Sequence, residues 1–197
     1  AASDVYKRQF TNYSLGSKTA AFIGFKNFLR LFQDEVFLKS LAITLKYVLI
    51  SVPLKLTFAL LVAYLLTRPS RMVTFYRSLY YLPSLVGGSV AVALVWKQLF
   101  ARKGLFNSVL ANMDMSTINW FGNQKLALYP LILMSVWQFG SSMIIFAAGL
   151  KEIPVSYYEA ARIDGARGYQ SFFRITLPLL TPTIFFNLVM QLINGFM

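Results

Sequence analysis

The chain has 197 residues, of which 57% are hydrophobic and only 13% are charged. Soluble domains average about 25% charged residues, so this composition excludes an ordinary soluble domain and indicates a membrane protein. The sequence contains no Cys and no His. Disulfides, Cys-based zinc or iron–sulfur centres and His-based acid–base catalysis are therefore excluded. We expect no metal and no cofactor.

The net charge of +12 has two interpretations. A basic protein can bind nucleic acid, and a membrane protein can carry Lys and Arg in loops that hold its topology against anionic lipid. The basic residues here are scattered, with no run of five. This pattern favours the second interpretation, so we expect a lipid bilayer and no nucleic acid as a partner.

The two ends of the sequence predict a piece of a longer protein. Residues 1–9, AASDVYKRQ, lack an initiating Met and an apolar signal region, and we assign them no native pattern. The last residues, QLINGFM, stop inside an apolar run.

An amphipathic helix is predicted ahead of the apolar segments. Phe25, Phe28, Leu29 and Phe32 recur with helical spacing, and the opposite face is polar. The segment is too short and too polar to span, so we expect it to lie flat at the membrane surface. Residues 1–40 are predicted to form an N-terminal extracytoplasmic segment, and residues 41–197 a transmembrane domain.

Four segments approach the ~20 apolar residues that a spanning helix needs. They are residues 41–66, 79–100, 126–150 and a segment from Leu179 to the end of the chain. The fold class is therefore predicted to be all-α, a polytopic helical membrane protein.

The first two spans contain unusual residues. Pro53 is expected to kink the first, because proline removes a backbone donor. Lys55 lies near its middle, either as a cation on a translocation path or as a side chain that snorkels or packs against partner helices. Gly87-Gly88-Ser89 in the second would let a neighbouring helix approach. Trp96 and Trp120 suit the interfacial aromatic belt.

The loops between spans differ in Lys and Arg content. Residues 67–77 and 151–175 are basic loops separated by two predicted spans, so both can lie on the same side of the membrane. Because Lys and Arg favour the cytoplasmic side, we expect both loops inside the cell. This assignment places the N-terminus outside and predicts that a first span is missing.

The loop of residues 151–175 shows helix signals. Pro154 predicts a turn, and Ser156 with Glu159 has the spacing of a capping box. Gly165 is placed to end this short helix, and a second helix is expected near residues 169–174. Ala160, Ala161 and Gly165 put small residues where another surface could approach. The alternative is a simple connecting loop in which Glu159 only caps the helix.

The same loop matches a known signature. Glu159-Ala160-Ala161, three residues, Gly165, nine residues, Ile175, one residue and Leu177-Pro178 follow the pattern E-A-A-x3-G-x9-I-x-L-P. In this pattern the chain resembles ABC importer permeases. The Asp164-Gly165 pair within the pattern is similar to the sequence found in the sugar-importer branch of that family. The likeness covers about residues 10–197.

The resemblance implies a permease fold with about four spans present of a six-span core. It implies import of a carbohydrate by a bacterial or archaeal inner-membrane complex. The implied partners are a cytoplasmic ATP-binding subunit, a second permease subunit and an extracytoplasmic solute-binding protein. The residues implied to couple to the ATPase are Glu159, Ala160, Ala161, Asp164, Gly165, Ile175, Leu177 and Pro178.

Polar residues on two spans are candidates for the substrate path, because polar groups inside a membrane usually face the bundle interior. They can instead join helices. The candidates are Ser135, Trp137, Gln138 and Ser142 on the third span, and Asn187, Gln191 and Asn194 on the fourth.

Three alternatives to a sugar permease stay open. One is a permease for another solute, such as a polyamine or glycerol phosphate. Another is a structural membrane subunit without its own pathway. The third is a membrane enzyme, which the lack of His and of acids within the spans disfavours.

Overall fold

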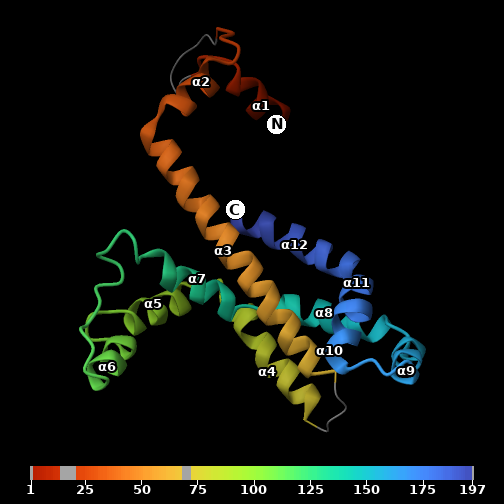
Figure 1. Cartoon of the computed structure of the whole chain (residues 1–197). Helices are drawn as coiled ribbons and strands as arrows, with labels where there is room; N and C mark the ends of the chain where they lie inside the picture. Colours follow the sequence, from red (N-terminus) through yellow and green to blue (C-terminus); the bar gives the residue numbers. More distant parts are fainter. Residues whose placement is uncertain (1, 14–20, 68–71, 197) are drawn as a thin grey trace. The chain divides into compact units, whose positions relative to one another are not determined.

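The computed structural model describes residues 2–13, 21–67 and 72–196. Within these ranges the chain is helical and contains no named strand (Figure 1). It forms two compact units, Ala1–Lys46 and Tyr47–Met197, which are described separately below.

The first unit contains α1 (Ala2–Gln9), α2 (Lys26–Gln33) and the beginning of α3 (Glu35–Leu65). The Asn27 side chain donates to the carbonyl oxygens of Gln9 and Thr11, at 2.8 and 3.1 Å. The predicted amphipathic helix is present as α2. Its apolar face, including Leu29 and Phe32, is exposed in the structure. The predicted location of residues 1–40 outside the cell stays a prediction.

The second unit contains the rest of α3 and the remaining helices. These are α4 (Val73–Val86), α5 (Val90–Leu99), α6 (Leu105–Asn112), α7 (Leu128–Trp137), α8 (Gly140–Glu152), α9 (Val155–Ile163), α10 (Gly168–Ser171), the π-helix η1 (Phe172–Thr176), α11 (Leu177–Leu179) and α12 (Thr181–Phe196).

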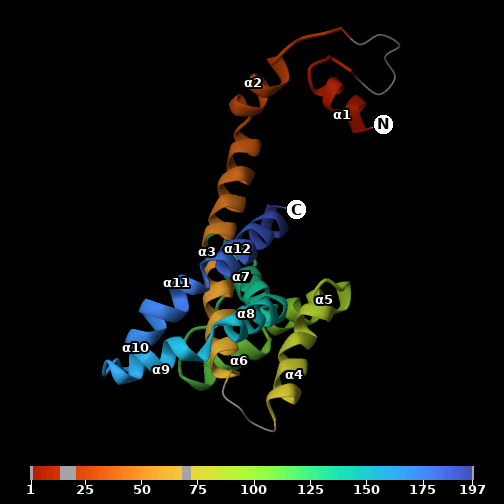
Figure 2. The ribbon, with the colours of Figure 1, turned by 90° about the vertical axis from the view of Figure 1, so that its right-hand side faces the viewer.

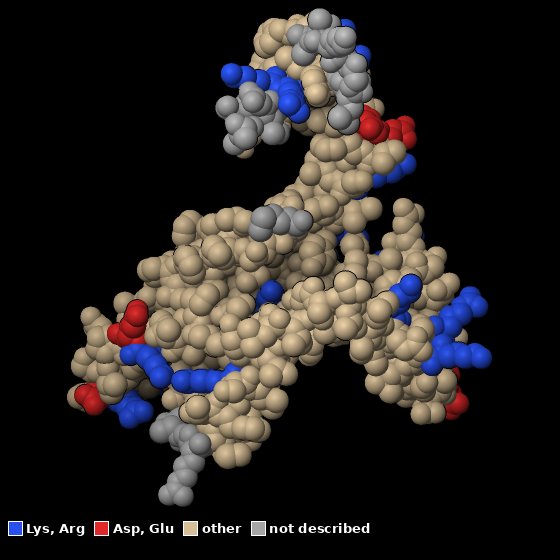
Figure 3. All heavy atoms as spheres, turned by 180° about the vertical axis from the view of Figure 1, so that it is seen from behind, with Lys and Arg blue, Asp and Glu red and all other residues tan. Residues whose placement is uncertain are grey.

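The core of the second unit lies where α3, α8 and the start of α12 meet. Val48, Val52 and Ala59 of α3 are buried with Met143 and Phe146 of α8. The two ribbon views show α3 beside α8, with α12 alongside (Figures 1 and 2). In the space-filling view most atoms belong to neither charged class, and the charged groups gather in small separate areas (Figure 3). A surface of this kind suits lipid and partner helices.

The predicted first span is present as α3, which is long and apolar enough to cross a membrane. It is longer than expected at its N-terminal end and runs through Pro53 without interruption. Each of the other three predicted spans consists of two helices joined at a bend, and it is long enough to cross a membrane only if the two helices are counted as one span.

The second predicted span is broken into two helices in the structure. Helices α4 and α5 meet at 98°, and the break falls on Gly87, Gly88 and Ser89. Ser89 has extended backbone and its hydroxyl accepts from the Val92 N–H, at 3.3 Å, so it caps a new helix. Gly87 does admit a neighbour, because an added Cβ would overlap the Gln138 side chain.

The third and fourth spans also bend. Helices α7 and α8 meet at 43° at Gln138 and Phe139. The segment of residues 168–179 meets α12 at 65° next to Leu180. The longer helix of the fourth span, α12, begins at Thr181, two residues after the start expected near Leu179.

Candidate functional site

Helix α9 begins earlier than the capping-box prediction requires, so the assignment of Ser156 as N-cap is wrong. Pro154 holds the N-cap position with φ −60° and ψ 134°, and the helix starts at Val155. Proline fixes φ in advance and so sets the helix start. Ser156 and Glu159 lie inside the helix, and no side-chain capping bond forms.

Glu159 is consequently free to face a partner. Its side chain is exposed, and among the described residues no hydrogen bond or ion pair involves its carboxylate. The sequence allowed Glu159 either to cap the helix or to contact a partner. The structure shows no capping bond, so contact with a partner is the role that stays a prediction.

Gly165 ends α9, as predicted. Its φ is +74°, a backbone region that glycine reaches without strain. The Ala166 N–H donates to the Ala161 carbonyl at 2.9 Å, and the Gly165 N–H donates to the Arg162 carbonyl at 3.1 Å. These two bonds form a Schellman motif, which satisfies the last carbonyls of the helix.

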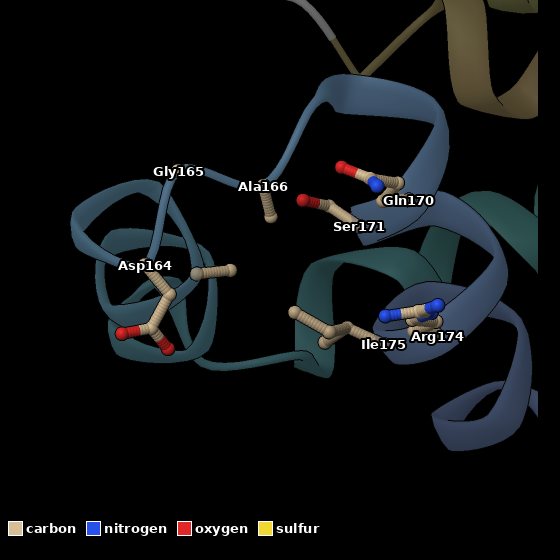
Figure 4. Close-up of a pocket in the computed structure, with 8 residues that line it drawn as sticks. Asp164, Gly165, Ala166, Gln170, Ser171, Arg174 and Ile175 are labelled. Atoms are coloured by element: carbon tan, nitrogen blue, oxygen red, sulfur yellow. The ribbon is translucent and has the colours of Figure 1, made fainter.

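The small residues of the signature do not all face outward. Ala160 is exposed, whereas Ala161 is only 9% exposed and turns into the loop. Ala161 lines a cleft of about 350 Å³ between the end of α9 and the next helices. Figure 4 shows Asp164, Gly165 and Ala166 on one side of this cleft, and Gln170, Ser171, Arg174 and Ile175 on the other.

A hydrogen bond joins α9 to the base of the fourth span. The Tyr158 hydroxyl lies 2.8 Å from the Thr176 hydroxyl, and Thr176 is almost fully buried. Thr176 ends the π-helix η1, a rare element that is frequent at functional sites. Leu177 and Pro178 follow directly as the first residues of α11. The signature residues therefore occupy one connected piece of structure.

The polar residues of the spans form a network that the sequence did not predict. Lys55 Nζ on α3 donates to Gln191 Oε1 on α12, at 3.0 Å. Gln191 Nε2 in turn donates to Ser142 Oγ on α8, also at 3.0 Å. One side chain thus links three helices. Sequence reasoning treated Lys55 apart from Ser142 and Gln191, because no local spacing connects them.

The other two polar residues of α12 have different surroundings. Asn187 is fully buried one turn before Gln191 and donates to the Thr183 carbonyl at 3.3 Å. Its Oδ1 has no hydrogen-bond partner among the described residues. Asn194 is exposed.

The polar face predicted for the third span is split by the bend. Ser142 lies on α8, while Ser135 and Trp137 lie on α7 and Gln138 follows directly. These three are half-buried. Trp137 packs edge-on against Trp96 at 5.8 Å, and Gln138 Nε2 donates to the Gly87 carbonyl at 3.4 Å.

Gln191→Leu is expected to destabilise the helix bundle. The change leaves Lys55 and Ser142 without their partner, and an unsatisfied buried polar group costs about 1–3 kcal/mol. We expect a lower unfolding temperature for the detergent-purified protein. Asn194→Leu, on the same helix but exposed, is the control and should change it little. Equal unfolding temperatures for the two variants would contradict the network.

The part of the chain that matches a known family includes the signature loop and most of the predicted spans. Residues 47–197 match the family described as binding-protein-dependent transport system inner membrane component. The chain belongs to this family. The predicted family is thereby confirmed, and the family description places its members in the inner membrane.

Individual relatives carry permease names. The chain is 52% identical over 190 residues to the probable ABC transporter permease protein YesP of Bacillus subtilis (strain 168), covering 95% of this chain and 61% of YesP. It is 37% identical to the sn-glycerol-3-phosphate transport system permease protein UgpA of Yersinia pseudotuberculosis serotype I (strain IP32953), over 90% of this chain and 60% of UgpA. The chain thus spans about three fifths of the length of these relatives.

The fold is that of known importers. The structure of a bacterial ABC transporter involved in the import of the acidic polysaccharide alginate matches with a TM-score of 0.76 at 22% identity. The match covers 96% of this chain and 65% of the other. The predicted all-α permease fold is confirmed.

Proposed function

We propose that this chain is the membrane-spanning permease subunit of an ABC importer for a carbohydrate or a related solute. The observation that carries the proposal is the signature loop, in which α9 presents an exposed Glu159 with no partner in the described chain. Relatives named as permeases for starch degradation products and for glycerol 3-phosphate support the solute class. Glycerol phosphate is therefore the second candidate solute.

The subunit would carry out no bond chemistry. These 197 residues contain no G-x-x-x-x-G-K-[ST] stretch, so ATP would be hydrolysed by a cytoplasmic partner subunit. A second permease subunit would complete the pore, and an extracytoplasmic solute-binding protein would deliver the solute. The chain would lie in the inner membrane of a bacterial or archaeal cell as a multi-pass protein.

Coupling would run from α9 into the spans. The ATPase subunit would bind the exposed face of α9, and the Tyr158–Thr176 bond would carry its movement to the base of the fourth span. Helix α12 contacts α3 and α8 through Gln191, so a shift of α12 would act on both. The spans would then alternate between outward and inward access.

Glu159→Lys is the test of this proposal. We expect about tenfold or more loss of the ATPase subunit recovered with the permease from membranes, because charge reversal puts like charges or an unpaired charge in the contact. The protein is co-expressed with the ATPase and permease subunits from the neighbouring reading frames, and the recovered ATPase is quantified.

Glu152→Lys is the matched control. Glu152 is also an exposed glutamate, but it ends α8 and lies outside α9. This variant should recover the ATPase subunit at the wild-type level. Unchanged recovery with Glu159→Lys, or equal losses for both variants, would contradict docking through α9.

A further inference from the structure

Lys55 is a cation in the middle of an apolar helix. It lies 10 residues before the end of α3 at Leu65 and 20 residues after its start at Glu35. At about 1.5 Å of rise per residue, the nearer end is roughly 15 Å away, well beyond the reach of a four-carbon side chain. The ammonium group is instead held at Gln191 of α12, at 3.0 Å. In the structure the ammonium group thus bonds across to α12 instead of extending along α3.

No carboxylate neutralises Lys55 within the described chain. The ion pair found there joins Lys39 and Glu35 at 3.7 Å, and the partner of Lys55 is a neutral amide. An ammonium group has three donors, of which Gln191 accepts one. Among the described residues no acid is placed in the middle of a span. The acids in the described chain are Asp4, Asp34, Glu35, Asp114, Glu152, Glu159 and Asp164.

A purely structural role does not require this charge. A neutral side chain could bond Gln191 and join the helices without the penalty of an ion inside the membrane. Charged residues in spans are accordingly functional sites by default. An anion that arrives from outside the chain would supply the missing countercharge.

The neighbours of Lys55 fit a solute with hydroxyl groups. Ser142 Oγ accepts from Gln191 Nε2, and the Asn187 amide lies one helical turn before Gln191. The Asn187 Oδ1 is buried and no described residue donates to it, so it has an accepting position left for a hydroxyl. Ser142 and Asn187 are fully buried in this structure, so these groups would meet a solute only in a state in which the helices have moved apart.

We propose that Lys55 recognises an anionic group on the transported solute, so that the importer takes an acidic carbohydrate or a sugar phosphate in preference to a neutral one. This inference rests on the proposed import function. Lys55 would bind the carboxylate or phosphate oxygens, while Gln191 holds the ammonium in place.

The test compares charged solutes with neutral counterparts. The complete transporter, with its ATPase, second permease and binding protein, is reconstituted in proteoliposomes. ATP-dependent uptake is measured for digalacturonate and its methyl ester, and for sn-glycerol 3-phosphate and glycerol. Because the same binding protein serves all variants, differences between them report the permease. The two pairs distinguish a carboxylate from a phosphate.

Lys55→Met keeps the length of the side chain and removes its charge. We expect it to lower the ratio of charged to neutral uptake about tenfold or more. Lys55→Arg should retain the preference for the charged solute. Gln191→Glu supplies an internal carboxylate to Lys55 and should also lower uptake of the charged solute selectively.

Three results would overturn the inference. They are an equal loss of charged and neutral uptake in Lys55→Met, no loss at all, and a wild-type transporter that takes up only the neutral members of the pairs. The third result would still leave a carbohydrate importer in place. Absence of any ATP-dependent uptake by the wild type would overturn both this inference and the proposed function.

Discussion

Gly165→Leu is expected to lower ATP-dependent uptake about tenfold or more, while membrane insertion stays normal. The physical cause is the backbone. Gly165 has φ +74°, where a side chain costs about 1–2 kcal/mol, yet among the described residues no atom beyond its two chain neighbours lies within 4 Å of an added Cβ. The strain would be relieved by losing the Schellman bonds, which reshapes the end of α9 beside the cleft.

Two smaller substitutions separate backbone strain from steric blocking of a partner. Asn tolerates positive φ better than Ala but is larger. If the backbone decides, Gly165→Asn retains more uptake than Gly165→Ala. Gly168→Ala is the control, because its Cβ also meets nothing within 4 Å and its φ is not positive. The opposite order of Asn and Ala would indicate a steric limit, and normal uptake with Leu would refute the coupling role of this loop.

Gly140→Leu is expected to prevent recovery of folded protein, and Gly140→Ala to lower its unfolding temperature. Gly140 begins α8 where it packs on α4. An added Cβ would overlap the Tyr80 carbonyl and lie 2.7 Å from the Tyr81 Cα. These are backbone atoms, so the two helices would have to separate. Overpacking costs about 1–3 kcal/mol, and more for a large side chain.

The measurement is the unfolding temperature of detergent-purified protein, with the monodisperse fraction from gel filtration. Each kcal/mol lowers the unfolding temperature of a chain of this size by about 2–4 °C. Gly88→Ala is the control, since its Cβ would meet nothing within 4 Å. A wild-type unfolding temperature for Gly140→Leu would show that α4 and α8 do not pack closely in the membrane.

The sequence correctly predicted the helices and helix ends that depend only on neighbouring residues. Apolar length located α3, and helical spacing located α2. Gly165 was predicted to end α9 because positive φ is a single-residue property. The Ser156 cap failed for a similar local reason, since Pro154 competes for the same position two residues earlier.

The breaks in the spans were harder to predict. Gly87 and Gly88 fit both a close helix contact and a helix end, and apolar content runs through the break in either case. The 98° bend is seen only in the tertiary structure, where Gly87 lies against the Gln138 side chain and Gly140 against the Tyr80 backbone. Hydropathy measures burial in lipid and carries no information about direction.

By itself the sequence determined the membrane class and the signature loop, and it supplied the candidate residues for contact with a partner or a solute. The tertiary structure decided which of them meet. Lys55 and Gln191 are 136 positions apart, and Gln191 and Ser142 are 49 apart. Periodicity places each side chain on a face of its own helix, but the pairing of faces depends on how three helices pack. Long-range packing therefore turned separate polar residues into one network that joins three helices.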